Sequence, residues 1–269
     1  MDRFFAYVTA PKRLSAVLYT ANLFAALLHL INASAVFLIG IMKGLNINFY
    51  TFFPAWDSTN ELFMPAFQYL CSANIGWLPA LFSLITVIFH VLQIMRLEHY
   101  KKDVLSGVNL WRWIEYSLSA PILGFIINVE VGIVDLPFLI VKTFLHATVL
   151  YFGYCSDIAN REALKTEKRV PIDWMPFVFS SIVFVVDWVI TFLYFGQNAQ
   201  QAPLFVQFIV YGLIIQYLFF PVILFLHYYK VSYFKNPVFT ELAFVGASYM
   251  SKTFLVWNIA GGAIKHSSG

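Results

Sequence analysis

Seven runs of mostly apolar residues divide this sequence, and each run is long enough to cross a lipid bilayer as a helix. A hydrocarbon core about 30 Å thick needs roughly 20 consecutive helical residues. The runs lack the alternation of apolar and polar residues that membrane-spanning strands require, so the expected fold class is an all-α membrane protein. We predict one seven-helix domain over residues 1–269, with helices near 14–41, 75–96, 107–128, 132–156, 172–196, 203–229 and 238–264.

The composition supports the same class. Only 12% of the residues are charged, against about 25% in an average soluble domain. The charges gather in short clusters between the apolar runs, which is typical of a multi-pass integral membrane protein whose partner is the lipid bilayer. No basic stripe interleaved with stacking aromatic residues indicates a nucleic-acid partner. No Walker loop, dinucleotide fingerprint or Ser-His-Asp arrangement indicates an enzyme, and no ligand spacing indicates a metal site.

The positively charged residues predict how the chain is oriented in the membrane. One side of the helices collects most of the Lys and Arg, whereas the other side has Lys43 and Lys265. Because positive residues stay inside, we predict a cytoplasmic N-terminus and an exterior C-terminus. Arg112 is assigned to the cytoplasmic side because it lies near the start of the third helix. The other residues of that side are Arg3, Lys12, Arg13, Arg96, Lys101, Lys102, Arg161, Lys165, Lys168, Arg169, Lys230 and Lys235.

The longest predicted exterior connection covers residues 42–74 and is rich in aromatic residues. Its "NINFYTFF" stretch is expected to form part of an exterior strand pair, as a lid or as a contact with a second copy. The two cysteines, Cys71 and Cys155, fall at opposite membrane faces in this arrangement. A disulfide between them is therefore not geometrically possible.

A few ionisable residues fall inside the predicted helices. Such groups are expensive in a bilayer, and they are usually paired or functional. They are His29, His90, Glu115, Asp135, Lys142, His146, Asp187, His227 and Lys252.

Lys252 is the one charged residue between positions 242 and 263, and it lies near the middle of the last helix. With about 1.5 Å of rise per residue, that position is close to the membrane midplane. One interpretation is a buried ion pair that fixes helix packing. The other is covalent use, because a neutral amine in an apolar pocket condenses with an aldehyde to form a Schiff base.

Glu115 is the expected carboxylate partner of Lys252. It lies about two turns into the third helix, counted from the cytoplasmic face. Ser119 follows it by four residues on the same helix face, and Ser248 precedes Lys252 by one turn. The carboxylate and hydroxyl groups would then lie on the cytoplasmic side of the amine. The alternative partner of Glu115 is Arg112, three residues earlier on the same helix.

Two segments carry a family resemblance, "LWRWIEYSLSAP" in the third helix and "YMSKTFLVW" in the seventh. Together they resemble the heliorhodopsins, and the cytoplasmic N-terminus matches the inverted topology of that family. The sixth helix, with "FIVYGLIIQYLFF", is also similar. So are the first helix, where Asn22 precedes His29 by seven residues, and the second, where Thr86 precedes His90 by four. The resemblance covers all seven helices.

The resemblance implies a cofactor. In heliorhodopsins the lysine of the seventh helix binds all-trans retinal as a protonated Schiff base, which by position is Lys252, with Glu115 as its counterion. The resemblance also implies a homodimer and a slow light sensor rather than a pump. The remaining retinal-binding residues are expected to be Trp113, Tyr116, Ser119, His146, Tyr217 and Ser248.

A polar cluster on the cytoplasmic side of the Schiff base is implied as well. Its members would be His29, Thr86, His90 and Asn109. The residues alone, without the resemblance, favour packed, hydrogen-bonded core histidines over a proton relay.

Three residues depart from the family pattern: Lys142, His146 and Asp187. Lys142 and Asp187 would lie at similar depths on adjacent helices, and a compensating ion pair is the favoured interpretation. Asp135, Lys142 and His146 are spaced by seven and four residues, so they are expected to share one helix face. The alternative is a proton path through His146, Asp187 and Asp135.

The main functional hypothesis is a retinal photoreceptor that signals to a cytoplasmic partner. A light-gated proton transporter on the same scaffold is the first alternative. The second is a seven-helix transporter or membrane enzyme in which the pair of Lys252 and Glu115 is only structural.

Overall fold

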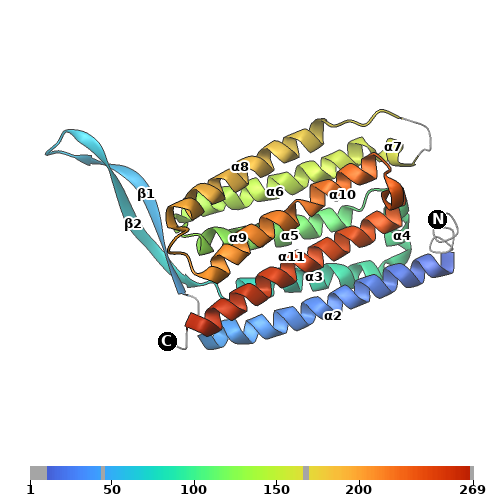
Figure 1. Cartoon of the computed structure of the whole chain (residues 1–269), viewed down its shortest axis with the longest axis horizontal. Helices are drawn as coiled ribbons and strands as arrows, with labels where there is room; N and C mark the ends of the chain where they lie inside the picture. Colours follow the sequence, from blue (N-terminus) through green and yellow to red (C-terminus); the bar gives the residue numbers. More distant parts are fainter. Residues whose placement is uncertain (1–10, 44–45, 166–169, 267–269) are drawn as a thin grey trace.

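The computed structural model describes residues 11–43, 46–165 and 170–266. Long helices lie side by side in one bundle, which bears out the expected helical class (Figure 1). The bundle consists of α2 (Pro11–Lys43), α3 (Leu78–Met95), α5 (Leu110–Glu130), α6 (Leu136–Ala159), α8 (Met175–Asn198), α9 (Leu204–Tyr217), α10 (Phe219–Tyr228) and α11 (Pro237–His266).

Five helical segments within the described residues are long and apolar enough to cross a membrane. Helices α5 and α11 lie alongside them but carry buried charges, which lowers their mean hydropathy. The start of α2 and the end of α11 lie at opposite ends of the bundle (Figure 1). The five segments are Arg13–Gly40, Leu78–Met95, Leu136–Ala159, Met175–Gln197 and Leu204–Tyr228.

Three short helices complete the helical part of the described chain. They are α4 (Leu97–Leu105), α7 (Arg161–Lys165) and the 3₁₀ helix η1 (Ser232–Lys235). Helices α4 and α7 lie at the end of the bundle where α2 begins (Figure 1). Of the residues behind the predicted orientation, Arg3, Lys168 and Arg169 lie outside the described part, as do the side chains of Lys12, Lys43 and Lys265.

Two predicted helices differ from the structure in an informative way. The helix predicted near 203–229 is divided into α9 and α10 at Leu218. Pro221 explains the division, because proline has no N–H to donate to the carbonyl of Tyr217. The helix predicted from residue 132 begins instead at Leu136, since the side chain of Asp135 accepts a hydrogen bond from the backbone N–H of Phe138 and caps the helix.

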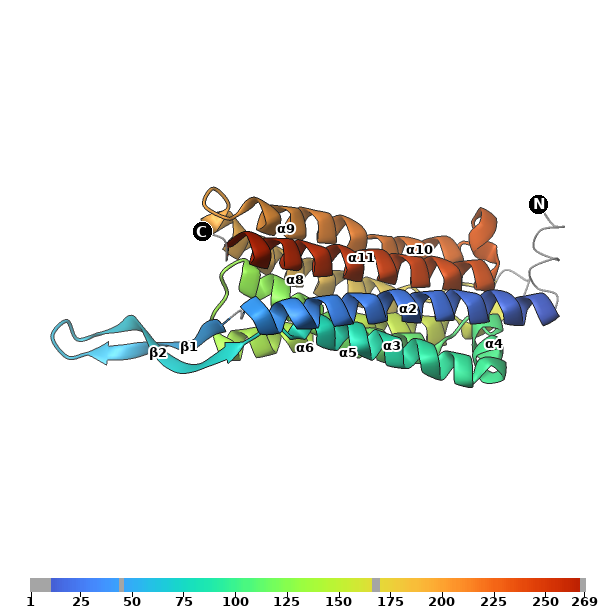
Figure 2. The same ribbon diagram turned by 90° about the horizontal axis from the view of Figure 1, so that it is seen from below.

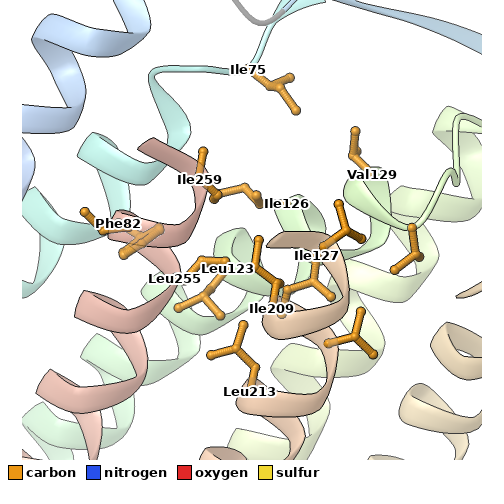
Figure 3. Packing of buried hydrophobic residues seen from close by; sticks show 14 of the residues in the cluster. Ile75, Phe82, Leu123, Ile126, Ile127, Val129, Ile209, Leu213, Leu255 and Ile259 are labelled. Atoms are coloured by element: carbon orange, nitrogen blue, oxygen red, sulfur yellow. The ribbon is translucent and has the colours of Figure 1, made fainter. Parts of the chain in front are cut away.

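An apolar cluster packs α3, α5, α9 and α11 against one another (Figure 3). Because lipid tails are as apolar as these side chains, van der Waals packing rather than burial from water holds such helices together. Leu255 follows Lys252 by three residues, and Leu123 follows Glu115 by eight, so the cluster fixes the helices that carry both charges. The central members are Phe82, Leu123, Ile126, Ile127, Ile209, Leu213, Leu255 and Ile259.

A two-stranded antiparallel hairpin projects beyond the bundle, at the end opposite α4 and α7 (Figures 1 and 2). Its strands are β1 (Asn46–Asp57) and β2 (Leu62–Asn74), so the expected strand pair containing "NINFYTFF" is confirmed. The buried ring of Phe49 packs against Phe125 with 6.1 Å between ring centroids. The backbone N–H of Tyr50 donates to the carbonyl of Val134 at 2.9 Å. These contacts attach the base of the hairpin to the bundle.

The two cysteines are free and lie on different elements. Cys71 is exposed in β2, whereas Cys155 lies in α6, near the end of the bundle that is remote from the hairpin.

Candidate functional site

Three helices converge on the amine of Lys252. The side chain projects from α11 and is 3% exposed. Its ammonium forms an ion pair with Glu115 of α5 and donates a hydrogen bond to Thr86 Oγ1 of α3 at 2.7 Å. It also lies over the ring of Tyr116, 5.4 Å from the centroid. The structure therefore brings together the two charges that the sequence analysis paired.

Glu115 is held by several donors at one oxygen. Besides Lys252, its Oε1 accepts hydrogen bonds from Thr86 Oγ1 at 2.7 Å and from Ser119 Oγ at 2.8 Å. Burying a carboxylate is costly unless it is paired and hydrogen-bonded, and this environment provides both. Ser119 contacts the carboxylate and does not line the neighbouring cavity, so it lies beside Glu115 rather than at the cavity wall.

A largely apolar cavity opens beside Lys252, between α5, α6, α8, α9, α10 and α11. Its wall at Gly153 is shaped by Trp113, since a Cβ added at Gly153 would overlap that indole ring. Of the expected retinal-binding residues, Trp113, Tyr116, His146, Tyr217, Ser248 and Lys252 line this cavity. The rest of the lining is mostly apolar and includes Leu123, Leu150, Phe177, Phe184, Phe220 and Leu224.

This combination fits retinal. A primary amine reaches the cavity wall, a carboxylate pairs with that amine, and aromatic side chains provide surfaces for a conjugated chain. Among the side chains that the structure describes, Lys142 is the other buried lysine, and it does not line the cavity.

The expected polar cluster is only partly assembled. The rings of His29 and His90 stack with 6.1 Å between centroids, and His90 Nδ1 lies 2.6 Å from Asn22 Oδ1. Thr86 is one turn from His90 and reaches both Glu115 and Lys252. Asn109 does not join this group, because its amide donates to Glu241 Oε1 at 2.8 Å.

Arg112 belongs to a second polar cluster that the sequence analysis missed. Its guanidinium pairs with Glu241 of α11 and, at 2.8 Å, with Asp157 of α6. The alternative pairing of Arg112 with Glu115 is therefore wrong. Asp157 also accepts hydrogen bonds from the Trp113 indole at 2.7 Å and from the Tyr228 hydroxyl at 2.8 Å. The two carboxylates lie near helix ends, where sequence alone suggests solvated loop charges.

Lys142, His146 and Asp187 form a third cluster, between α6 and α8. Lys142 Nζ is 2.9 Å from Asp187 Oδ1, which is the ion pair favoured from the sequence. The same nitrogen donates to the Asp187 backbone carbonyl at 2.6 Å and to Thr191 Oγ1 at 2.9 Å. His146 Nδ1 is 2.8 Å from Asp187 Oδ2. The expectation that Asp135 shares this helix face is wrong, because it precedes the first turn of α6 as its N-cap.

A solved structure, the crystal structure of the transmembrane domain and linker region of Salpingoeca rosetta rhodopsin phosphodiesterase, is similar with a TM-score of 0.59 and 14% identity. The match covers 99% of this chain and 75% of that chain, and it shows a rhodopsin-like fold. No curated protein sequence matches significantly.

A sequence profile of the heliorhodopsin family matches residues 18–264. The chain belongs to the heliorhodopsin family, as its third and seventh helices indicated. This membership supports a rhodopsin-type, light-sensing retinal protein in a membrane, in a family that is generally not enzymatic.

The third cluster gives a stability prediction. Asp187→Asn leaves the buried Lys142 ammonium without its carboxylate, so we expect the free energy of unfolding to fall by about 3–5 kcal/mol. Adding Lys142→Met to Asp187→Asn removes the unpaired charge and should recover most of this loss. The measurement is the midpoint of thermal unfolding in detergent, monitored by scanning fluorimetry.

The control is Lys165→Gln, which breaks an exposed ion pair with Glu162 and should change the midpoint little. An unchanged midpoint for Asp187→Asn would show that the buried pair does not stabilise the bundle.

Proposed function

We propose that this chain is a light-sensing retinal photoreceptor in which Lys252 holds the chromophore and Glu115 is its counterion. One observation carries this proposal: a buried lysine amine lies at the wall of an aromatic cavity and pairs with a buried carboxylate. Retinal, when bound covalently through this amine, supplies absorption of visible light and a change of shape on excitation.

The residues around Lys252 set the electrostatics of the site. Glu115 balances a positive charge on the Lys252 nitrogen, and Thr86 and Ser119 fix the carboxylate by hydrogen bonds to its Oε1. The hydroxyl of Tyr116 donates to the backbone carbonyl of Phe244 at 3.0 Å, which holds its ring beside the amine. The site is thus preorganised around one charge pair.

Moving the Lys252 nitrogen away from Glu115 separates opposite charges in a medium of low dielectric constant. This separation stores energy and favours transfer of a proton to Glu115 or to the polar groups near His90. The altered charge and packing would act on α8 to α11. The chain connections that follow α6 and α10 would then present a changed surface to a cytoplasmic partner.

The proposal includes a placement in the membrane. The chain forms a single domain, and α5 and α11 cross the bilayer together with the five more apolar segments, giving seven crossings. The N-terminus is cytoplasmic and the hairpin is exterior. A homodimer is consistent with the exposed aromatic side chains of the hairpin, among them Phe52, Trp56, Phe63 and Phe67.

The attachment site gives the first test. Lys252→Ala should abolish the visible absorption band that forms when retinal is added to the purified protein, because no amine remains at the cavity wall. Lys252→Arg keeps a positive charge beside Glu115 and should also lack the band, which separates loss of attachment from loss of folding.

Lys165→Ala, on the surface, serves as the control and should keep the band. If the unaltered protein forms no band, or if Lys252→Ala keeps it, the pair of Lys252 and Glu115 is structural. A seven-helix transporter or membrane enzyme is then favoured.

The counterion gives a second test. Glu115→Gln removes the negative charge that stabilises a positive charge at the Lys252 nitrogen, so the absorption maximum should move to longer wavelength. The measurement is the absorption spectrum at fixed pH, with Ser117→Ala, on the same helix, as the control. An unchanged spectrum would assign the counterion role to another residue.

The third polar cluster favours a second candidate function, a light-gated proton transporter. His146 lines the cavity at Lys252 and contacts Asp187 of α8. These two side chains could therefore pass a proton from the cavity toward α8. In that case light should produce currents in voltage-clamped cells whose reversal voltage follows the proton gradient, and Asp187→Asn should reduce them. Absence of such currents would leave the sensor as the function.

A further inference from the structure

A second, smaller cavity lies next to the cavity at Lys252, and Tyr116 and Ser248 line both. It measures about 10 Å³ and lies between α3, α5 and α11. Glu115 and Glu241 both line it, so a single void connects the counterion with the cluster around Arg112. Its remaining lining residues are Phe89, His90, Gln93, Arg112, Tyr116, Val245 and Ser248.

Polar groups at this cavity lack hydrogen-bond partners that a water molecule would supply. Gln93 Oε1 and Arg112 Nε are buried and have no hydrogen-bond partner among the described residues. Gln93 is 6% exposed and Arg112 is 7% exposed. A polar void that holds about one water-sized probe, with unpaired donors and acceptors around it, is the kind of site where proteins bind internal water.

A third cavity, also of about 10 Å³, continues the route. It shares Arg112 and Glu241 with the second cavity and reaches Gly107 in the turn between α4 and α5. That turn lies at the end of the bundle remote from the hairpin (Figure 2). The two voids therefore form a polar route from Glu115 to that end, interrupted by the ion pair of Arg112 and Glu241.

We propose that Glu241 is a proton acceptor for Glu115, with a water molecule in the second cavity as the bridge. The proton leaves the carboxylic acid of Glu115 and passes through that water to the carboxylate of Glu241. Glu115 becomes a carboxylate and Glu241 a carboxylic acid, so the transfer conserves protons and charge. The proposal rests on the proposed function only for the event that first protonates Glu115.

The surroundings of Glu241 suit this role. One guanidinium, that of Arg112, lies between two buried carboxylates, and protonation of Glu241 leaves Arg112 paired with Asp157. The cluster then changes from one net negative charge to neutral, which lowers the cost of keeping it away from water. Tyr100 and Asn109 donate to Glu241 Oε1 at 3.0 and 2.8 Å, and His227 lines the third cavity beside it.

Asp157 is a weaker candidate for the same step. It accepts three hydrogen bonds, from Arg112, Trp113 and Tyr228, and it does not line the second cavity. Glu241 is the carboxylate that shares a void with Glu115.

The test is light-minus-dark infrared spectroscopy of the full chain with retinal. As the carboxylic-acid band of Glu115 decays, we expect a second carboxylic-acid band to rise, and Glu241→Gln should remove this second band. Deprotonation of Glu115 should slow by on the order of 100-fold in that variant. The visible absorption band should remain, since Glu241 does not line the chromophore cavity. Glu98→Gln, at an exposed carboxylate, is the matched control and should leave the infrared band and the rate unchanged.

A second measurement needs no chromophore. Val245→Phe fills the second cavity without altering either carboxylate, whereas Val245→Ala keeps it open. In the retinal-free protein, an O–H stretching band that shifts on exchange into H₂¹⁸O should disappear in Val245→Phe alone. In the retinal-bound protein, that variant should slow deprotonation of Glu115 as Glu241→Gln does.

Two results would overturn the proposal. One is a second carboxylic-acid band that still rises in Glu241→Gln as the Glu115 band decays, and the other is a second band that Asp157→Asn removes instead. If the unaltered protein forms no visible band, the proposed function fails separately. The water band of the retinal-free protein then decides, and its absence rejects the bridge between Glu115 and Glu241.

Discussion

The buried pair of Lys252 and Glu115 is the interaction on which the site depends. Neither charge could remain alone at this depth, because an unpaired ion in a water-free interior costs several kcal/mol. The pair forms where α11 and α5 meet, and Thr86 of α3 donates to the same carboxylate oxygen. Apolar packing through Leu123 and Leu255 keeps these helices in register, so the electrostatics of the site are set by the packing of the bundle.

Two other clusters also keep buried charges paired, with different partners. Lys142 and Asp187 close an ion pair between α6 and α8, while Arg112 is shared between Glu241 and Asp157. Lys142 and Lys252 are thus both buried and paired, but of these two only Lys252 lines the large aromatic cavity. This difference in surroundings, rather than burial or charge, is what favours Lys252 over Lys142 as the proposed attachment residue.

Much of the fold could be predicted because the membrane imposes helix length and apolar composition. The ends of the helices depended on single residues whose effect cannot be seen in the pattern of apolar residues. Pro221 divides the sixth long segment at Leu218, and Asp135 caps α6 instead of lying within it. The strand pair at 46–74 could be expected from its aromatic residues, whereas its register and its attachment through Tyr50 to Val134 required the folded chain.

The sequence by itself determined the membrane class and the family, and it correctly paired Lys252 with Glu115. It could do so because charges in apolar helices are rare enough to be matched by depth and helix alone. Only the tertiary structure decided the partners of Arg112, which are Glu241 and Asp157 rather than its helical neighbour Glu115. Sequence spacing reports which residues share a helix face, but it does not report which face another helix covers.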